Sequence, residues 1–213
     1  MSQVVESLRP KFRAQSRQGL LLLGLSLLTA GLGLAMVASA SAIDSFKQTD
    51  SAATMFLRQG AFAIVGLVVL VIASNLPMGF YRRLSMPILF GALGLQVATV
   101  LFGADINGNR NWLDLGFVSI QPSEFLKLAL IIALAQLFAQ LGANEERNRQ
   151  LWTWAFLLSA ASLVLVAIMG RDLGTGVVMA VLLMGMFLFA GMRWHTWLLI
   201  AVAGIASAAA LIM

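Results

Sequence analysis

The stretch GLLLLGLSLLTAGLGLAMVASASAI, residues 19–43, contains 25 consecutive residues without a charged side chain. A helix that crosses the hydrocarbon core of a bilayer needs about 17 to 25 predominantly apolar residues. Basic residues precede the stretch and small residues end it, as in a signal peptide, but the apolar region of a signal peptide is only about 7 to 15 residues long. We therefore interpret residues 19–43 as an uncleaved first transmembrane span.

Similar apolar runs recur along the rest of the chain. They cover residues 60–78, 86–104, 128–143, 151–169, 173–192 and 196–213. Only 11% of the residues are charged, against about 25% in a soluble globular domain. Lipid cannot satisfy the hydrogen bonds of an open sheet edge, so helices are the expected spanning elements. The sequence therefore predicts an all-α fold, a polytopic transmembrane helix bundle with about seven spans.

The positive charges indicate how the bundle is oriented. Placing the N-terminus in the cytoplasm puts nine basic residues on the inner side: Arg9, Lys11, Arg13, Arg17, Arg82, Arg83, Arg147, Arg149 and Arg193. Four then lie outside: Lys47, Arg58, Arg110 and Arg171. This agrees with the positive-inside rule. We assign residues 1–18 to a cytoplasmic basic tail and 19–213 to the transmembrane domain, which we expect to be incomplete at its C-terminus because the last apolar run has no flanking charge.

Composition also excludes several kinds of site. The chain has no cysteine and a single histidine, so it has no disulfide, thiolate metal site or histidine cluster. The net charge of +5 does not indicate nucleic-acid binding, because the arginines are spread over loop ends instead of gathering on one face. No organic cofactor is expected.

The most polar stretch, DINGNRNWLDLGFVSIQPSEFLKLAL, runs from Asp105 to Leu130. Asn107-Gly108 is typical of a turn. Pro122 suits the first position of a helix, with Gln121 as its cap. Glu124 then falls in the first turn, where the positive end of the helix dipole favours a carboxylate. We expect the run at 128–143 to reach spanning length by beginning near Pro122.

That assignment carries Lys127 into the membrane, three positions after Glu124 and on the same face of the helix. A charge at the centre of a bilayer costs about 2.5 to 3.5 kcal/mol on insertion scales, so such residues generally face a cavity or a partner. One interpretation is a structural Glu124/Lys127 pair or a lysine that reaches the interface. The other is a polar cavity that opens outward.

A second polar interruption, MGRDLGTG, covers residues 169–176. Aspartate is a preferred helix N-cap, so Asp172 suits the start of the next helix. Gly174 and Gly176 would permit close helix packing. The alternative interpretation places Asp172 and Thr175 in the same cavity as Lys127.

These outward-facing motifs closely resemble the SEDS family (shape, elongation, division and sporulation), the FtsW/RodA/SpoVE group. The family pattern of Asn-Gly, arginine before tryptophan, Gln-Pro-Ser-Glu and a later lysine is matched by Asn107, Gly108, Arg110, Trp112, Gln121, Pro122, Ser123, Glu124 and Lys127. Asp-Leu-Gly-Thr is matched at residues 172–175. MVASAS, residues 36–41, and FLRQ, residues 56–59, look most like the FtsW cell-division branch.

The chain departs from the family pattern at two places. Asn111 stands before Trp112 where many members have arginine, and Gly170-Arg171 replaces the usual Gln-Pro before Asp172. Family members also have about ten spans, with the loop said to hold their catalytic aspartate in the later half. The resemblance therefore covers the N-terminal portion of such a protein.

The resemblance implies a peptidoglycan glycosyltransferase that polymerises lipid II during cell division or cell-shape maintenance in the bacterial inner membrane. It also implies a class B penicillin-binding protein and the division or elongation machinery as partners. The expected substrate-binding residues are Arg110, Gln121, Glu124, Lys127 and Thr175. Asp172 is the one candidate for a catalytic base, although the family assigns that role elsewhere.

Cations near a leaving diphosphate stabilise it, and a diphosphate site is also compatible with Mg²⁺ or another divalent cation. Two other functions remain open: a transporter (flippase) for the lipid-linked precursor, and a non-catalytic division scaffold. Because we expect the chain to lack the catalytic loop of the family, the sequence does not decide whether this chain is an enzyme by itself.

Overall fold

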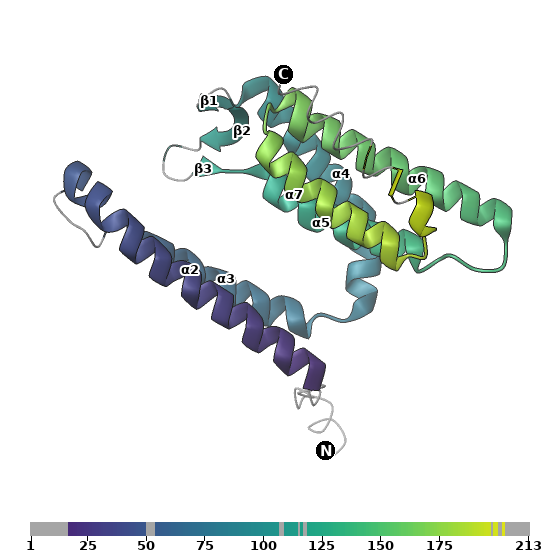
Figure 1. The fold of residues 1–213 in the computed structure, drawn as a ribbon, viewed down its shortest axis with the longest axis horizontal. Coiled ribbons are helices and arrows are strands. Elements are labelled where there is room, and N and C mark those ends of the chain that lie inside the picture. The colour runs from purple at the N-terminus through teal and green to yellow at the C-terminus, as the bar shows by residue number, and fades with distance from the viewer. Residues whose placement is uncertain are drawn as a thin grey trace, which may run out of the picture. The chain divides into compact units, whose positions relative to one another are not determined.

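The computed structural model describes residues 17–49, 54–106, 109–114, 116, 119–196, 198–199 and 202. The chain divides into two compact units, Met1–Leu76 and Pro77–Met213. Two helices make up the described part of the first unit, and four α-helices, a π-helical turn and a small sheet form the main elements of the second (Figure 1). The predicted tail, apart from Arg17 and Gln18, and the Asn107-Gly108 turn lie outside the described residues.

The first unit is a pair of long apolar helices, α2 (Arg17–Thr49) and α3 (Thr54–Asn75). Their most apolar segments, Gly19–Ser39 and Leu57–Asn75, have no residues buried inside the protein. Two hydroxyls of α2 bond within their own helix: Ser26 Oγ donates to Leu22 O at 2.8 Å, and Thr29 Oγ1 donates to Leu25 O at 3.0 Å. Because these polar groups are already satisfied, the surface of the pair suits lipid.

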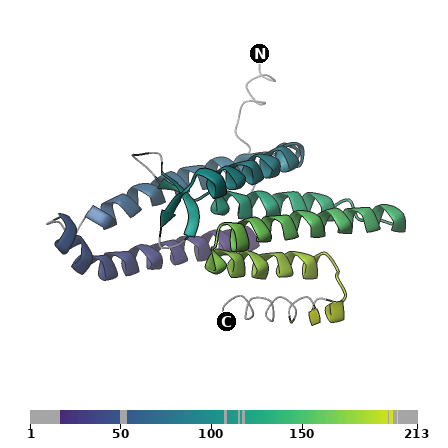
Figure 2. The same ribbon diagram turned by 90° about the horizontal axis from the view of Figure 1, so that it is seen from above.

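The second unit is a helix bundle. It contains α4 (Met78–Phe102), α5 (Pro122–Phe138), α6 (Glu145–Leu163), a π-helical turn η1 (Val164–Met169) that continues α6, and α7 (Leu173–Phe189). The helix α5 contacts α4, α6 and α7, and the four helices lie side by side when viewed from above (Figure 2). The core of the unit therefore forms around α5.

Buried residues recur along the helices at spacings of three and four, as expected for packed helices. On α4 they are Ser85, Leu89, Ala92, Gln96 and Thr99, and on α5 the seam includes Leu126, Ala129, Leu130, Ala133, Leu134 and Leu137. The alanines four residues apart let the backbones approach closely. At the other end of α5, Phe138 packs against Trp152 and Phe187, with ring centroids 5.1 and 5.4 Å apart.

A three-stranded antiparallel sheet, which the sequence did not predict, fills the connection between α4 and α5. It consists of β1 (Ala104–Ile106), β2 (Asn109–Asp114) and β3 (Ser119–Ile120), in that order. The central strand β2 pairs with β1 at Ala104↔Trp112 and with β3 at Asp114↔Ser119. The described part of this connection thus forms a small sheet, and the all-α prediction holds for the spans but misses it.

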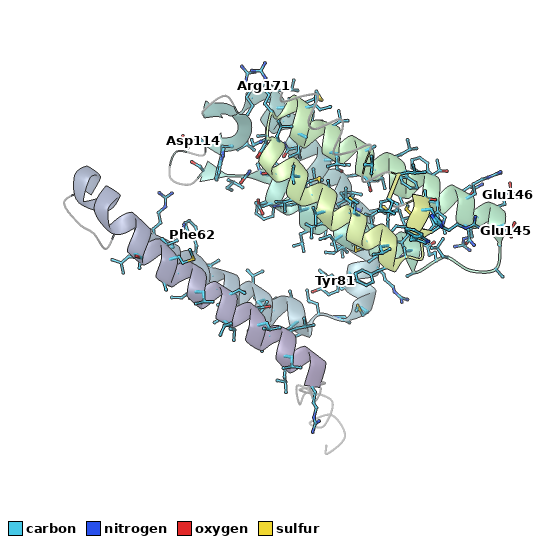
Figure 3. All side chains as sticks on the ribbon, in the orientation of Figure 1. Phe62, Tyr81, Asp114, Glu145, Glu146 and Arg171 are labelled. Carbon is cyan, nitrogen blue, oxygen red and sulfur yellow. The ribbon has the colours of Figure 1, made fainter. Side chains whose placement is uncertain are left out.

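The two segments predicted to face outward lie at one end of the second unit. Figure 3 shows Asp114 of β2 and Arg171 of the second interruption at that end, with Glu145 and Glu146 at the opposite end. Asn144 caps the start of α6 there by accepting from Arg147 N at 3.0 Å. In this unit, successive connections between helices therefore lie at alternate ends, as the charge pattern predicts.

Four helices among the described residues are long and apolar enough to cross a membrane: Gly19–Ser39, Leu57–Asn75, Met78–Phe102 and Glu145–Met169. A shorter apolar helix covers Leu173–Phe189. The polytopic helical fold is confirmed, while nearly all of the predicted seventh run lies outside the described residues. Helix ends differ from the apolar runs: α3 ends at Asn75 before Pro77, and α5 ends at Phe138, five residues before the run does.

Gly176 provides a test of this packing. A Cβ at Gly176 would lie 2.7 Å from Ala167 Cβ in η1, whereas a Cβ at Gly185, on the same helix α7, would meet nothing within 4 Å. We expect Gly176→Ala to lower the free energy of unfolding by about 1–3 kcal/mol through overpacking. Gly185→Ala should leave it unchanged or raise it by up to about 1 kcal/mol. Thermal unfolding in nanodiscs, followed by tryptophan fluorescence, measures both; equal effects would contradict this close approach.

Candidate functional site

The candidate site begins where β3 passes into α5. Gln121 is the N-cap residue of α5 and Pro122 follows at the first helical position, as predicted. The Gln121 side chain makes no capping hydrogen bond. Its Nε2 donates instead to Asp172 Oδ2 at 3.2 Å and lies 3.5 Å from Thr175 Oγ1. Gln121 therefore links the start of α5 to the start of α7.

Asp172 is the N-cap of α7, also as predicted. Its Oδ1 accepts from Thr175 N at 2.9 Å, and its Oδ2 accepts from Thr175 Oγ1 at 2.7 Å and from Gln121 Nε2. Three donors thus converge on one carboxylate. The structure brings Gln121, Asp172 and Thr175, which are far apart in sequence, into one hydrogen-bonded cluster.

Lys127 and Glu124 form an ion pair on α5, which was one of the two interpretations of these residues. Lys127 Nζ donates to Glu124 Oε1 at 2.8 Å. The lysine side chain is 15% exposed and the glutamate side chain 56% exposed. At 1.5 Å per residue, Lys127 lies roughly 7 to 8 Å along the helix from Pro122. The Lys127 ammonium thus lies beside the exposed carboxylate of Glu124.

Arg110 lies on β2 and approaches the cluster through its backbone. Its N–H donates to Gly170 O at 3.0 Å, and its side chain is exposed. Gly170 is two residues before Asp172, the N-cap of α7. The Arg110–Gly170 hydrogen bond therefore places β2 beside the start of α7. All the predicted site residues are therefore at the same end of the unit, with Gln121, Asp172 and Thr175 in contact and Glu124 with Lys127 as a separate pair.

The segment before Asp172 has an unusual backbone. In η1, Gly170 N donates to Leu165 O at 2.9 Å, a hydrogen bond five residues back that replaces the α-helical one. Arg171 follows with φ of 55°, the left-handed region that non-glycine residues seldom adopt. Short π-helical turns occur frequently at functional sites. The π-helical turn and the left-handed residue Arg171 change the direction of the chain, so that Asp172 begins α7 beside Gln121.

Sequence reasoning missed a buried polar pair beneath the sheet. Gln96 Nε2 on α4 donates to Asn111 Oδ1 on β2 at 3.3 Å, and both side chains are fully buried. Asn111 Oδ1 also faces Gly170, where an added Cβ would overlap it. The signal was present in the sequence, because Gln96 is an amide side chain in the middle of an apolar run and such residues need partners.

The described residues do not form a resident metal centre. They contain no group of three or more histidine, cysteine, aspartate or glutamate side chains that could hold an ion. The Asp172 oxygens already accept three hydrogen bonds, and Glu124 already pairs with Lys127. Mg²⁺ bound by few carboxylates depends on substrate phosphates for further ligands. The donor set therefore does not fit a protein-held Mg²⁺.

Comparison with known proteins agrees with the resemblance. A family model described as a cell cycle protein, covering FtsW, RodA and SpoVE, matches residues 19–213. A curated relative from Nitrosococcus halophilus, named probable peptidoglycan glycosyltransferase FtsW, is 34% identical over 195 residues, which are 90% of this chain and 50% of the relative. A protein of the same name from Tolumonas auensis is 35% identical over 210 residues, 96% of this chain and 51% of the relative. The chain spans about half the length of these relatives.

Solved structures show the same fold. The crystal structure of the rod shape determining protein RodA of Thermus thermophilus matches with a TM-score of 0.62 at 24% identity, covering 86% of this chain and 58% of that one. A second match, with a TM-score of 0.56 at 27% identity, covers 82% and 52% and comes from a study titled "Structural coordination of polymerization and crosslinking by a peptidoglycan synthase complex". This chain is thus a multi-pass protein of the bacterial inner membrane, and it belongs to the SEDS family of FtsW, RodA and SpoVE, with an FtsW-like sequence.

Proposed function

We propose that this chain contributes the first helices and the outer polar site of a peptidoglycan glycosyltransferase that polymerises lipid II. The observation that carries the proposal is the gathering of Arg110, Gln121, Glu124, Lys127 and Asp172 at one end of the second unit. Relatives named peptidoglycan glycosyltransferase support the reaction class. A polar site in an apolar bundle is costly, so it requires a functional or structural reason.

The reaction requires positive charge near its leaving group. An acceptor hydroxyl attacks the anomeric carbon, the bond from that carbon to the diphosphate oxygen breaks, and the diphosphate leaves with the electron pair. Cationic side chains that stabilise the developing charge lower the barrier. We assign this role to Arg110 and Lys127. The exposed carboxylate of Glu124 holds the Lys127 ammonium in place through the 2.8 Å ion pair.

We assign Asp172 a positioning role instead of a catalytic one. A general base must accept a proton from the substrate and be within hydrogen-bond reach of it. Both Asp172 oxygens already accept hydrogen bonds, from Thr175 and Gln121. The carboxylate is therefore suited to hold the starts of α5 and α7 together, and the proton acceptor would come from another part of the complete protein.

The proposal extends to the partner. A match to a peptidoglycan synthase complex whose title couples polymerisation with crosslinking supports a crosslinking partner. We propose that this partner is a class B penicillin-binding protein of the division machinery, since the sequence is FtsW-like. It would take the strands that the polymerase releases on the outer face.

Lys127→Ala tests the cationic site. In the complete protein we expect it to abolish polymerisation of labelled lipid II in proteoliposomes without preventing membrane insertion, because the charge beside the diphosphate is lost. The double variant Lys127→Ala/Glu124→Ala, which leaves no unpaired carboxylate, should be equally inactive. Arg147→Ala, at the opposite end of the unit, removes a cation that bonds Gln140 and should remain active.

The same assay separates the alternatives. Undiminished polymerisation by Lys127→Ala would refute the assigned role of the lysine. Movement of labelled precursor across the bilayer without any polymerisation by the parent protein would favour a transporter. Normal division in cells with Lys127→Ala, combined with loss of division when partner-binding surfaces change, would favour a scaffold.

Asp172 variants test the positioning role. Asp172→Asn keeps an oxygen that can cap α7, so we expect most of the polymerisation rate to remain. Asp172→Ala removes the cap and the acceptor for Gln121, and should lower the free energy of unfolding by about 0.5–2 kcal/mol. Lipid II polymerisation and thermal unfolding, measured on the same preparations, distinguish a positioning role from a catalytic one. Complete inactivity of Asp172→Asn with unchanged stability would instead indicate the catalytic base.

A further inference from the structure

The central strand of the outer sheet is held from below by a buried polar contact. Gln96 and Asn111 have no exposed surface, and the 3.3 Å hydrogen bond between them joins α4 to β2 across 15 positions of sequence. Gln96 Oε1 and Asn111 Nδ2 have no protein partner. A pair of apolar side chains would avoid the cost of burying these two atoms. The amides therefore need a reason beyond stability.

The surroundings of the pair show what it constrains. Gly170 faces Asn111 Oδ1 so closely that a side chain at position 170 would overlap it. The adjacent residue Arg110 donates its backbone N–H to Gly170 O at 3.0 Å. Two consecutive residues thus hold strand β2. Asn111 bonds to Gln96 on α4, and Arg110 bonds to Gly170 in the turn before Asp172.

Buried polar contacts restrict a structure to one arrangement, because a shifted register would leave more atoms without partners. Apolar packing is less specific, since many side-chain arrangements bury similar area. The β1–β2 ladder is irregular between Ala104 and Ile106, and an irregular ladder constrains register less than a regular one. A directional contact at Asn111 supplies the missing constraint.

We propose that Gln96 and Asn111 are positioning residues that fix β2, and with it Arg110, on the turn at Gly170. The consequence for ligand binding rests on the proposed function, in which Arg110 binds the diphosphate. The positioning of the strand itself does not depend on that function. Substrate-binding geometry on the outer face is therefore set by two amides that never contact the substrate.

Leucine substitutions separate positioning from stability. Gln96→Leu and Asn111→Leu should each lower the unfolding temperature, since each leaves the other amide entirely unpaired. Gln96→Leu/Asn111→Leu should recover most of that loss, because both polar groups are replaced by apolar ones. If the pair served stability alone, the double leucine variant would regain the position of β2 and ligand binding together with its unfolding temperature.

The position of β2 can be measured directly, because the chain has no cysteine and accepts introduced label pairs. We choose Asp114→Cys on β2 and Val178→Cys on α7, both exposed, and measure the distance between spin labels in nanodiscs. The labelled parent should give one narrow distance peak. The double leucine variant should lose that peak although it is stable. A narrow peak in the double leucine variant would overturn the proposal.

Binding of undecaprenyl pyrophosphate to the complete protein in nanodiscs provides the functional measurement. Misplacement by about 1 Å can cost roughly 100-fold in a positioned site, so we expect binding to weaken by about 10- to 100-fold in the double leucine variant and in Arg110→Ala. If the distance peak is lost but neither variant changes binding, positioning by the amides stands and the role of Arg110 in the proposed function fails.

The contact with Gly170 gives an independent measurement. Gly170→Ala adds a methyl group against Asn111 Oδ1 and near Val166 O, and should lower the unfolding temperature. Asn111→Ala removes the opposing amide, so the loss in Gly170→Ala/Asn111→Ala should be smaller than the sum of the two single losses, as for residues in contact. Additive losses would contradict the contact. Gly185→Ala, which meets open space, is the matched control.

Discussion

The structure depends on one constraint: lipid offers no hydrogen bonds, so a polar group in the bundle is stabilised chiefly by partners within the protein. In the first unit, the hydroxyls of Ser26 and Thr29 on α2 meet this constraint inside their own helix. In the second unit, polar side chains come together at one end, where they bond across elements. Asp172 there accepts from the residue that starts α5 and from the first turn of its own helix.

The polar end of the second unit contains two separate sets of hydrogen bonds. Directional hydrogen bonds among Gln121, Asp172 and Thr175 join the starts of α5 and α7. The Gln96–Asn111 bond joins the sheet to α4. Asn111 and Gly170, two of the three residues at which the chain departs from the family pattern, face each other. They form one altered contact, because only glycine leaves room for the buried amide.

Much of the helical architecture could be predicted because its cause is local. Apolar length indicated the spans, Pro122 and Gln121 marked the start of α5, and Glu124 and Lys127 are close enough in sequence to pair on one helix. The outer sheet was not predictable in the same way. Its strands are two to six residues long, and their pairing depends on how the bundle below positions the two ends of the loop.

The sequence by itself determined that the chain is a helical membrane protein, which residues interrupt its apolar runs, and which family they resemble. These properties follow from composition, spacing and motif, which need no knowledge of contacts. Only the tertiary structure decided that Gln121 bonds Asp172, that Gln96 lies beneath Asn111, and that Gly170 contacts both Arg110 and Asn111. The two residues of each contact are 15 to 60 positions apart in sequence, so no local periodicity relates them, and the packing of α4, α5 and α7 brings them together.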